Sequence, residues 1–134
     1  MTDGTSRVIK FVRAQIDPLP DDRCQALVQV ERVGLGPITG TAQGGSGQAD
    51  ELRAVARAAA DALSEAYEAE GVKVRIRGVQ PVEAFGQTVV IVSLAATRGT
   101  EARSLLGVCD ATGDLARATA LAVLNCTNRF LGLE

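Results

Sequence analysis

The side chains that could do chemistry in this 134-residue chain are amides, thiols and carboxylates, because histidine is absent. Without an imidazole there is no Ser–His or Cys–His nucleophile, no histidine general base and no histidine ligand for zinc. The three cysteines, Cys24, Cys109 and Cys126, form no CxxC pair, which is typical of free thiols. The carboxylates show no pattern that supplies a set of metal ligands. We therefore expect no catalytic residue, no metal and no cofactor.

Two amides stand out because asparagine is a poor residue for the middle of a helix. Asn125 and Asn128 are three positions apart within an expected helix, so they lie on roughly the same side of it. Their amides could hydrogen-bond to a ligand or to a partner subunit. In the alternative interpretation, they bond to backbone at a sheet edge or in a loop and hold the end of the helix.

Two loops that precede expected helices are the best places for a ligand pocket. Residues 44–50 read GGSGQAD, and backbone N–H groups at such a helix start can bind an anion. The loop lacks a P-loop or dinucleotide fingerprint, and Asp50 and Glu51 would repel an anion, which favours a flexible connector. Residues 108–114 form the second such loop. The candidate ligand-binding residues are Gly107, Cys109, Asp114, Asn125, Asn128, Gly44 and Ser46.

The position of Cys109 just before a helix start could lower the pKa of its thiol. Asp110 and Asp114 act in the opposite direction, and the chain offers no histidine to activate a thiol. We do not expect a nucleophilic role for Cys109, and Cys126 lies on the apolar stripe of its helix.

Hydrophobic periodicity indicates which elements must position these residues. Alternation over residues 24–31 predicts a half-buried strand with Cys24, Ala26, Val28 and Val30 on one side. Apolar residues spaced by three and four predict a helix from Asp50, as its N-cap, to Gly71. A second helix is expected over Leu115–Leu131, closed by Gly132.

The order of elements occurs twice, as three strands followed by a helix. Pro81 follows Pro18 by 63 positions, and the same offset matches Gly107 with Gly44. We predict an α+β fold built from a duplicated βββα unit, with a mixed or antiparallel sheet, two helices on one face and a pseudo-two-fold axis. The chain is one domain, divided into a disordered tail at 1–6 and units at 7–71 and 72–134. The alternative is two unrelated stretches with similar turn residues.

The two expected helices differ in charge. Eight charged residues lie between Asp50 and Glu70, whereas Arg117 is the one charge between Leu115 and Asn128. A helix that is apolar on most sides is buried on most sides, and the continuous run at Val89–Ala96 is typical of a strand covered on both faces. We expect a second chain to cover the second helix, in a homodimer. In the alternative, that helix lies centrally within the monomer.

Composition narrows the partners. The net charge is −2 and no block of basic residues occurs, so nucleic acid is not an expected partner. The apolar runs are too short to cross a membrane, and the segment MTDGTSR has no apolar stretch that could direct export. The sequence favours a cytoplasmic protein without a membrane partner.

Residues 113–131, GDLARATALAVLNCTNRFL, resemble the last helix of the C-terminal regulatory domain of 2-isopropylmalate synthases. Asn125, Asn128 and Arg129 fall on the Asn, Asn and Arg of that family. The resemblance implies a pseudo-symmetric domain that dimerises and binds an end-product amino acid between its units. The family's catalytic barrel does not occur in these 134 residues, and the first expected helix lacks the paired asparagines, so leucine binding is not carried over.

These observations favour a non-catalytic small-molecule-binding or regulatory dimerisation domain. The alternative is a structural, assembly or partner-docking protein that forms an oligomer through its apolar second helix. A third hypothesis is an enzyme, such as an isomerase or cyclase, that uses backbone donors and a carboxylate. A double-stranded-RNA-binding domain would need lysines at the helix start, where this chain has Gly113, Asp114 and Arg117.

Overall fold

The computed structural model describes residues 9–111 and 113–132. The tail expected at residues 1–6 lies outside the described residues. The elements are β1 (Ile9–Leu19), β2 (Arg23–Arg32), β3 (Gly36–Gly45), α1 (Gln48–Ala66), the short 3₁₀ helix η2 (Glu68–Glu70), β4 (Val72–Ala84), β5 (Gln87–Arg98), β6 (Glu101–Asp110) and α2 (Leu115–Leu131). The predicted α+β fold with a duplicated βββα order is confirmed.

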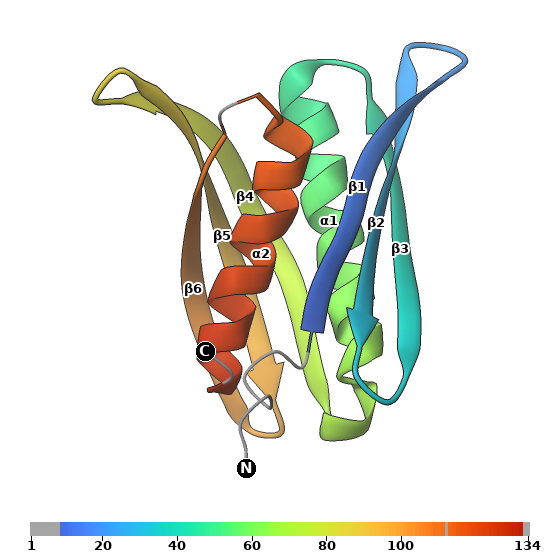
Figure 1. Ribbon diagram of the computed structural model, residues 1–134, viewed down its shortest axis with the longest axis vertical. Helices are drawn as coiled ribbons and strands as arrows, with labels where there is room; N and C mark the ends of the chain where they lie inside the picture. Colours follow the sequence, from blue (N-terminus) through green and yellow to red (C-terminus); the bar gives the residue numbers. More distant parts are fainter. Residues whose placement is uncertain (1–8, 112, 133–134) are drawn as a thin grey trace.

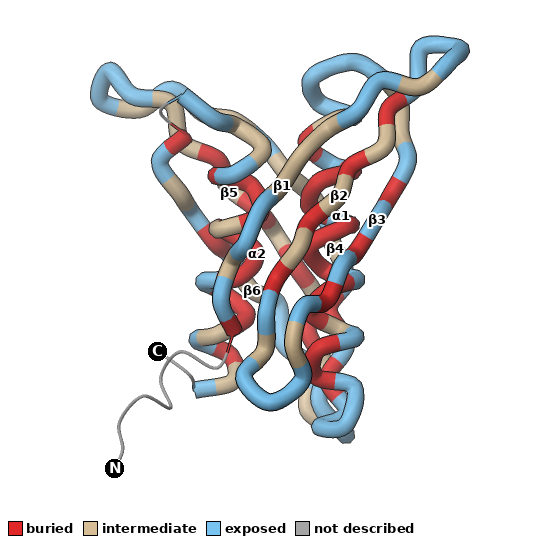
Figure 2. Tube along the Cα trace, turned by 45° about the vertical axis from the view of Figure 1, so that its right-hand side comes forward, coloured by how far each residue is buried: buried red, intermediate tan, exposed pale blue. Residues whose placement is uncertain are grey.

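The strands form two separate antiparallel sheets, β1-β2-β3 and β4-β5-β6, called here the first and the second sheet. Both helices lie between the two sheets and begin at the same end of the molecule (Figure 1). Helix α1 packs on β2 and β3 of its own unit and on β4 of the other, while α2 packs on β5, β6 and β1. The sheets diverge toward the end where the helices begin (Figure 2). We call this the open end.

Alternation decides which side of each sheet meets the helices. In β2 the predicted inward residues Cys24, Ala26, Val28 and Val30 are all buried, and in β5 the buried set is Val90, Val92, Leu94 and Ala96. Each sheet therefore has an inner face on the helices and an outer face on the opposite side. The core between the sheets is aliphatic, with alanines allowing close approach of helix and strand.

Matching irregularities establish the internal pseudo-symmetry. A bulge occurs at Val12 in β1, opposite Gln29 and Val30, and at Arg77 in β4, opposite Ser93 and Leu94. The same twist and local bend are thus introduced at equivalent places in the two units.

The residue matches made from the sequence need correction. In the second unit, Gly107 pairs with Val92 and packs against α2. In the first unit, Val28 is equivalent to Val92, and the glycine that pairs with it and packs against α1 is Gly40. Gly107 therefore corresponds to Gly40, not to Gly44. Pro81 likewise corresponds to Ile16 rather than to Pro18. A single offset fails because equivalent hairpin loops differ in length. The β1–β2 loop has three residues and the β4–β5 loop has two.

The start of α1 also differs from the prediction. Gly47 is its N-cap, and Asp50 lies in the first turn with Glu51, where both carboxylates face the positive end of the helix. Helix α2 has the expected side-chain cap, since Asp114 accepts a hydrogen bond from the Arg117 N–H at 2.9 Å. Gly71 and Gly132 follow the helical segments in the left-handed conformation, with φ of 73° and 74°.

Helix α2 is covered within the single chain, which corrects the expectation that a second chain must cover it. Val123 and Leu124 are buried, as are Thr119 and Thr127, whose hydroxyls donate to the Leu115 and Val123 carbonyls. The sequence estimate assumed one sheet beneath a two-helix layer. Two sheets enclose the helices from both sides, so α2 needs few charged residues. None of the helices in the described part of the chain is long and apolar enough to span a membrane.

Candidate functional site

A pocket of about 570 Å³ at the open end brings together segments from both units. Helix α1 contributes its first residue, Gln48. The β4–β5 hairpin contributes Pro81, Val82, Glu83 and Thr88, and the segment that leads into α2 contributes Ala111, Gly113, Asp114 and Leu115. The pocket therefore borders the starts of both helices, which lie at the same end of the molecule (Figure 1).

The lining combines two carboxylates with an apolar wall. Glu83 accepts a hydrogen bond from the Thr88 hydroxyl, which holds its carboxylate near the tip of the hairpin. The Asp114 carboxylate is held by its cap on α2. Pro81 and Leu115 supply the apolar part of the wall, because the side chain of Val82, which also borders the pocket, alternates to the outer face of its sheet. The arrangement suits a small molecule that carries a cationic group next to an apolar one, since paired carboxylates favour a positive charge.

Of the seven candidate residues, Asp114 lines this pocket. Gly107 faces α2, where a Cβ would lie 2.3 Å from the Ala122 carbonyl oxygen, so glycine is needed there for packing. Gly44 is half-buried beside α1. The exposed Ser46 donates its backbone N–H to the Asp22 carbonyl at 3.1 Å, which ties the loop at 44–50 to the β1–β2 turn.

The cysteines are poor nucleophiles in this structure. Burial raises the pKa of the Cys109 thiol, and Asp110 raises it further, against the opposing effect of Arg117. Burial raises the pKa of Cys126 to about 11 and also raises that of Cys24. All three remain protonated near neutral pH.

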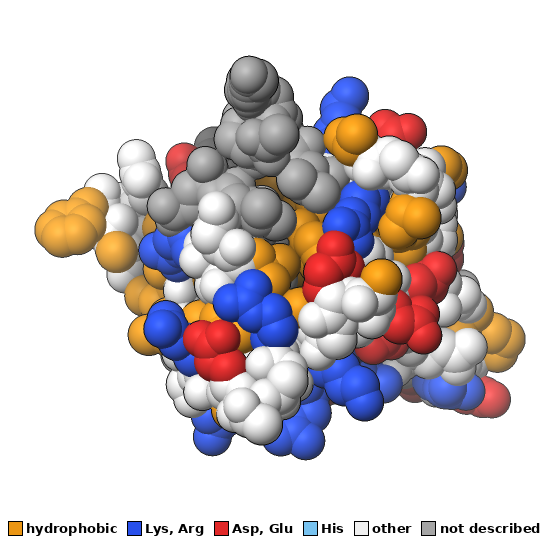
Figure 3. All heavy atoms as spheres, turned by 90° about the horizontal axis from the view of Figure 1, so that it is seen from below, with side chains coloured by type: hydrophobic (Ala, Val, Ile, Leu, Met, Phe, Trp, Pro, Cys, Tyr) orange, Lys and Arg blue, Asp and Glu red, His pale blue; other side chains and the backbone are white. Residues whose placement is uncertain are grey.

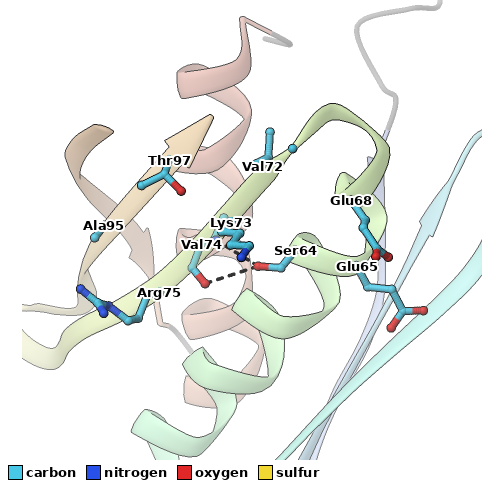
Figure 4. Close-up of a pocket in the computed structure, with 10 residues that line it drawn as sticks. Ser64, Glu65, Glu68, Val72, Lys73, Val74, Arg75, Ala95 and Thr97 are labelled. Carbon is cyan, nitrogen blue, oxygen red and sulfur yellow. Dashed lines mark hydrogen bonds between the residues drawn. The ribbon is translucent and has the colours of Figure 1, made fainter. Parts of the chain in front are cut away.

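The two asparagines do not lie at the open end. Asn125 is exposed on α2, and Asn128 is half-buried near the C-terminal end of that helix, with its Oδ1 buried and without a hydrogen-bond partner. Asn128 occupies the place in α2 that Ser64 has in α1. Ser64 bonds to the free edge of β4, accepting from the Val74 N–H at 3.0 Å (Figure 4).

A second hollow, of about 630 Å³, lies where α1 ends beside β4 and β5. Its charged side chains do not converge: Glu65 and Glu68 point to one side of the helix end and Arg75 points to the other (Figure 4). The Ser64 hydroxyl is engaged by Val74, so this hollow offers a ligand fewer convergent polar groups than the pocket at the open end.

The opposite end of the molecule carries a charged cluster that the sequence did not reveal. Arg32 donates to the Ala66 carbonyl at the end of α1, pairs with both carboxylate oxygens of Glu70 and lies 4.9 Å from the Tyr67 ring centroid. Its hydrogen bonds lower the pKa of Glu70. Basic and acidic side chains are interspersed over this end rather than gathered into patches of one sign (Figure 3). The cluster fastens α1 to β2.

Sequence reasoning located the two helix starts but missed the β4–β5 hairpin. Glu83 and Thr88 pair across its two strands, and both lie on the inner side above α2. The available signal was the two-residue turn Phe85-Gly86, whose φ values of 55° and 76° bring Glu83 back beside Thr88. No spacing in the sequence relates that turn to Asp114.

Within residues 9–111 and 113–132, no group of three or more His, Cys, Asp or Glu side chains could hold a metal ion. No protein-family model and no curated protein matches the chain.

Proposed function

We propose that this protein is a non-catalytic regulatory domain that binds a small molecule in the pocket at the open end. One observation carries the proposal: the starts of both helices and the β4–β5 hairpin converge on a single hollow that holds two carboxylates and an apolar wall. Pockets that bind small ligands are concave and mostly apolar with a few placed polar groups. The resemblance of residues 113–131 to a synthase regulatory domain points to the same class of function.

The ligand class that fits the lining is a primary amine with an aliphatic group, including amino acids. Glu83 and Asp114 would bind the ammonium, and Pro81 and Leu115 would cover the aliphatic part. A carboxylate on the same ligand would lie near the first backbone N–H groups of α2, where an anion is favourable.

Regulation would follow from where the lining residues come from. Gln48 belongs to the first unit and the remaining lining residues to the second. A ligand that contacts both favours an arrangement in which the two units are held together at the open end, and it can shift an equilibrium only by its differential affinity for the two arrangements. We place this activity in the cytoplasm, supported by the three free cysteines.

The test is a thermal-shift and calorimetric screen of aliphatic amines, amino acids and small carboxylic acids at millimolar concentration. A ligand at 100 times its Kd stabilises the native state by about 2.7 kcal/mol, which is easily measured. Amines and amino acids should stabilise the protein, and simple carboxylic acids should not.

A pair of variants locates the site. Glu83→Gln removes one charge from the pocket while retaining an acceptor for Thr88, and should weaken amine binding at least about tenfold. Asp61→Asn removes the same charge from the exposed middle of α1 and should leave binding unchanged. No stabilisation of the folded wild-type protein by any amine or amino acid, or equal binding by Glu83→Gln, would contradict the proposal.

A further inference from the structure

The outer faces of the two sheets differ in chemistry although their backbones are equivalent. Several polar residues on the outer face of the first sheet have apolar counterparts in the second. Gln25 corresponds to Val89, Thr39 to Leu106, Thr41 to Val108 and Asp17 to Val82. The duplication therefore provides an internal reference for what a solvated outer face looks like in this fold.

The first sheet has an outer face typical of contact with water. Arg13 donates to Gln29 at 3.1 Å and to Gln15 at 3.2 Å, and Gln15 donates to Asp17 at 3.0 Å. Arg23 bonds to Gln43 on the neighbouring strand. These side chains satisfy one another across the strands, with Leu27 and the bulge residue Val12 as apolar residues among them.

Over part of its outer face, the second sheet has apolar side chains in place of this network. Ile91 lies at its centre on the middle strand, paired with Val108, and Leu106 lies beside Ser93. Leu106 and Val108 are 64% and 56% exposed. Large apolar residues that are this exposed and adjacent mark an interaction surface rather than the scattered exposure that is normal for a monomer.

The β4–β5 hairpin, at one end of this surface, carries a second feature that indicates an interaction surface. Phe85, at the tip of the β4–β5 turn, is fully exposed and has a φ of 55°, a conformation that an aromatic residue seldom adopts. The chain has three phenylalanines, one tyrosine and no tryptophan, and one of these four aromatic side chains is held out into solvent beside Val82 and Val89.

We propose that the outer face of the second sheet, defined by Val82, Val89, Ile91, Leu106 and Val108, is the surface through which two copies of this chain form a dimer. The proposal concerns this sheet, not α2, and it stands whether or not the pocket at the open end binds a ligand.

Shape favours a second copy as the occupant. In one cross-strand row Gly78, Ser93 and Leu106 lie side by side, with the bulky leucine on β6 and no side chain on β4. A Cβ placed on Gly78 would meet nothing within 4 Å, so the space above it is empty. Consider a two-fold axis that runs parallel to the strands, between the two copies, in front of Ser93. This axis sets β4 of one copy over β6 of the other. Each Leu106 then fills the space above Gly78 in the other copy.

The arginines of this face are compatible with the same axis, while the exposed Lys73 and Asp110 lie at its two ends, paired with Thr97 and Val89. The outer side of β4 carries Arg75 and Arg77, and Arg77 donates to the Ser104 hydroxyl on β6 at 2.9 Å. With β4 set over β6, these arginines face the neutral Ser104 of the second copy rather than each other. The like-charge repulsion that disfavours many self-associations is avoided.

The area is sufficient. Three strands of 10 to 13 residues make a face roughly 40 Å long and 15 Å wide, and the solvent-accessible area of such a surface exceeds its projection. This approaches the roughly 800 Å² that each partner buries in a stable complex. Pairing through the free edge of β6 alone would leave Ile91 and Val89 uncovered, so face-to-face packing of the sheets is favoured.

The first test uses the chain's own reference residues. The double variant Leu106→Thr/Val108→Thr places threonine at both positions, as the first sheet does at the equivalent Thr39 and Thr41. It should raise the Kd of the dimer at least 30-fold in sedimentation equilibrium of the full chain. Leu35→Thr is the matched control, because Leu35 is 62% exposed but lies in the β2–β3 turn, and its dimerisation should equal that of the wild type. Circular dichroism melts check that all variants fold.

The second test locates the axis. In a Cys109→Ser background, Ser93→Cys should cross-link to its copy with a short bismaleimide, because facing sheets pack about 10 Å apart. The equivalent Gln29→Cys on the first sheet should not cross-link. A wild-type protein that remains monomeric up to about 1 mM, a dimer that Leu106→Thr/Val108→Thr leaves intact, or a dimer in which Ser93→Cys fails to cross-link would overturn the proposal.

Discussion

The two βββα units share a backbone plan and differ in the side chains that support it. Both place a bulge in the first strand and a glycine of the third strand against the helix. At the helix end, the first unit has Arg32 over Tyr67 with Glu70, and the second has Arg98 over Phe130 with Glu101. The comparison teaches that close packing is the constraint that both units satisfy, while polar contacts were free to diverge.

The largest expected effect tests the shared constraint. In Gly40→Ala and Gly107→Ala, the new Cβ would lie 2.1 Å and 2.3 Å from the backbone oxygens of Ala58 and Ala122, and a helix backbone cannot move aside cheaply. Each variant should lose about 3 kcal/mol in urea unfolding. Gly44→Ala is the control, because its Cβ would lie 3.4 Å from the Asp50 oxygen, and it should lose less than about 1 kcal/mol. An equal loss in Gly44→Ala would contradict close approach to the helix as the reason, and unequal losses in Gly40→Ala and Gly107→Ala would contradict their equivalence.

The next effect tests the divergence at the helix ends. Arg32 has an 18% exposed side chain, caps α1 and pairs with Glu70, so Arg32→Ala should cost about 2 kcal/mol in unfolding free energy. Arg98 has a 41% exposed side chain and pairs with Glu101 at 3.3 Å, so Arg98→Ala should cost less than about 1 kcal/mol. The two units would be energetically alike if both variants lost the same stability.

The same cluster gives an acid dependence. Hydrogen bonding from Arg32 lowers the pKa of Glu70 in the folded state. A carboxyl group with a lowered folded pKa contributes stability above its unfolded pKa of about 4.3, and that stability is lost as pH falls through the folded value. Urea unfolding from pH 6 to pH 2 should therefore show a steeper loss for the wild type than for Glu70→Gln. If the unfolding free energies of the wild type and Glu70→Gln fell in parallel with pH, the Arg32–Glu70 pair would not contribute to the acid dependence.

A smaller effect distinguishes Ser64 from its counterpart Asn128. Ser64→Ala removes the acceptor of the Val74 N–H at the edge of β4 and should cost about 1 kcal/mol. Asn128 has a buried Oδ1 with no partner, so Asn128→Ala should change the unfolding free energy by less than about 0.5 kcal/mol. A large loss in Asn128→Ala would show that its amide makes a contact equivalent to that of Ser64.

The smallest effect concerns Tyr67, whose buried hydroxyl has no hydrogen-bond partner. Tyr67→Phe removes this hydroxyl and keeps the ring, and should be neutral or stabilising by up to about 1 kcal/mol. Burial raises the pKa of Tyr67 to about 12, so the wild type loses stability as pH rises from about 10 to 12, where only the unfolded chain is ionised. In Tyr67→Phe, the unfolding free energy should not show this loss between about pH 10 and 12.

Much of the fold could be predicted because its signals are local. The period of two in β2 identified the inward residues, and Asp114 and Gly132 marked the ends of α2. The start of α1 was misplaced because the helix begins without a side-chain cap at Gly47, so Asp50 was mistaken for the first signal. The equivalence of Gly107 with Gly44 was wrong because one offset cannot follow loops of different length.

The candidate site was predictable in part. The helix starts were identified and Asp114 was among the candidates, but Glu83 and Thr88 were not, since no sequence spacing records that the β4–β5 hairpin and the start of α2 border one pocket. Residues 89–96 lie in β5, but the sequence assigned the uncovered apolar surface to α2. The structure buries much of α2 and leaves Leu106 and Val108 exposed on the outer side of β6, while the outward residues of β5 are half-buried.

By itself the sequence determined the elements, their inward sides and the twofold repetition, because periodicity and turn residues act over a few positions of the chain. Only the tertiary structure decided that the strands divide into two sheets with both helices between them. That choice depends on how much apolar surface distant elements can bury against one another. It fixed which surface remained uncovered and which loops met at the open end.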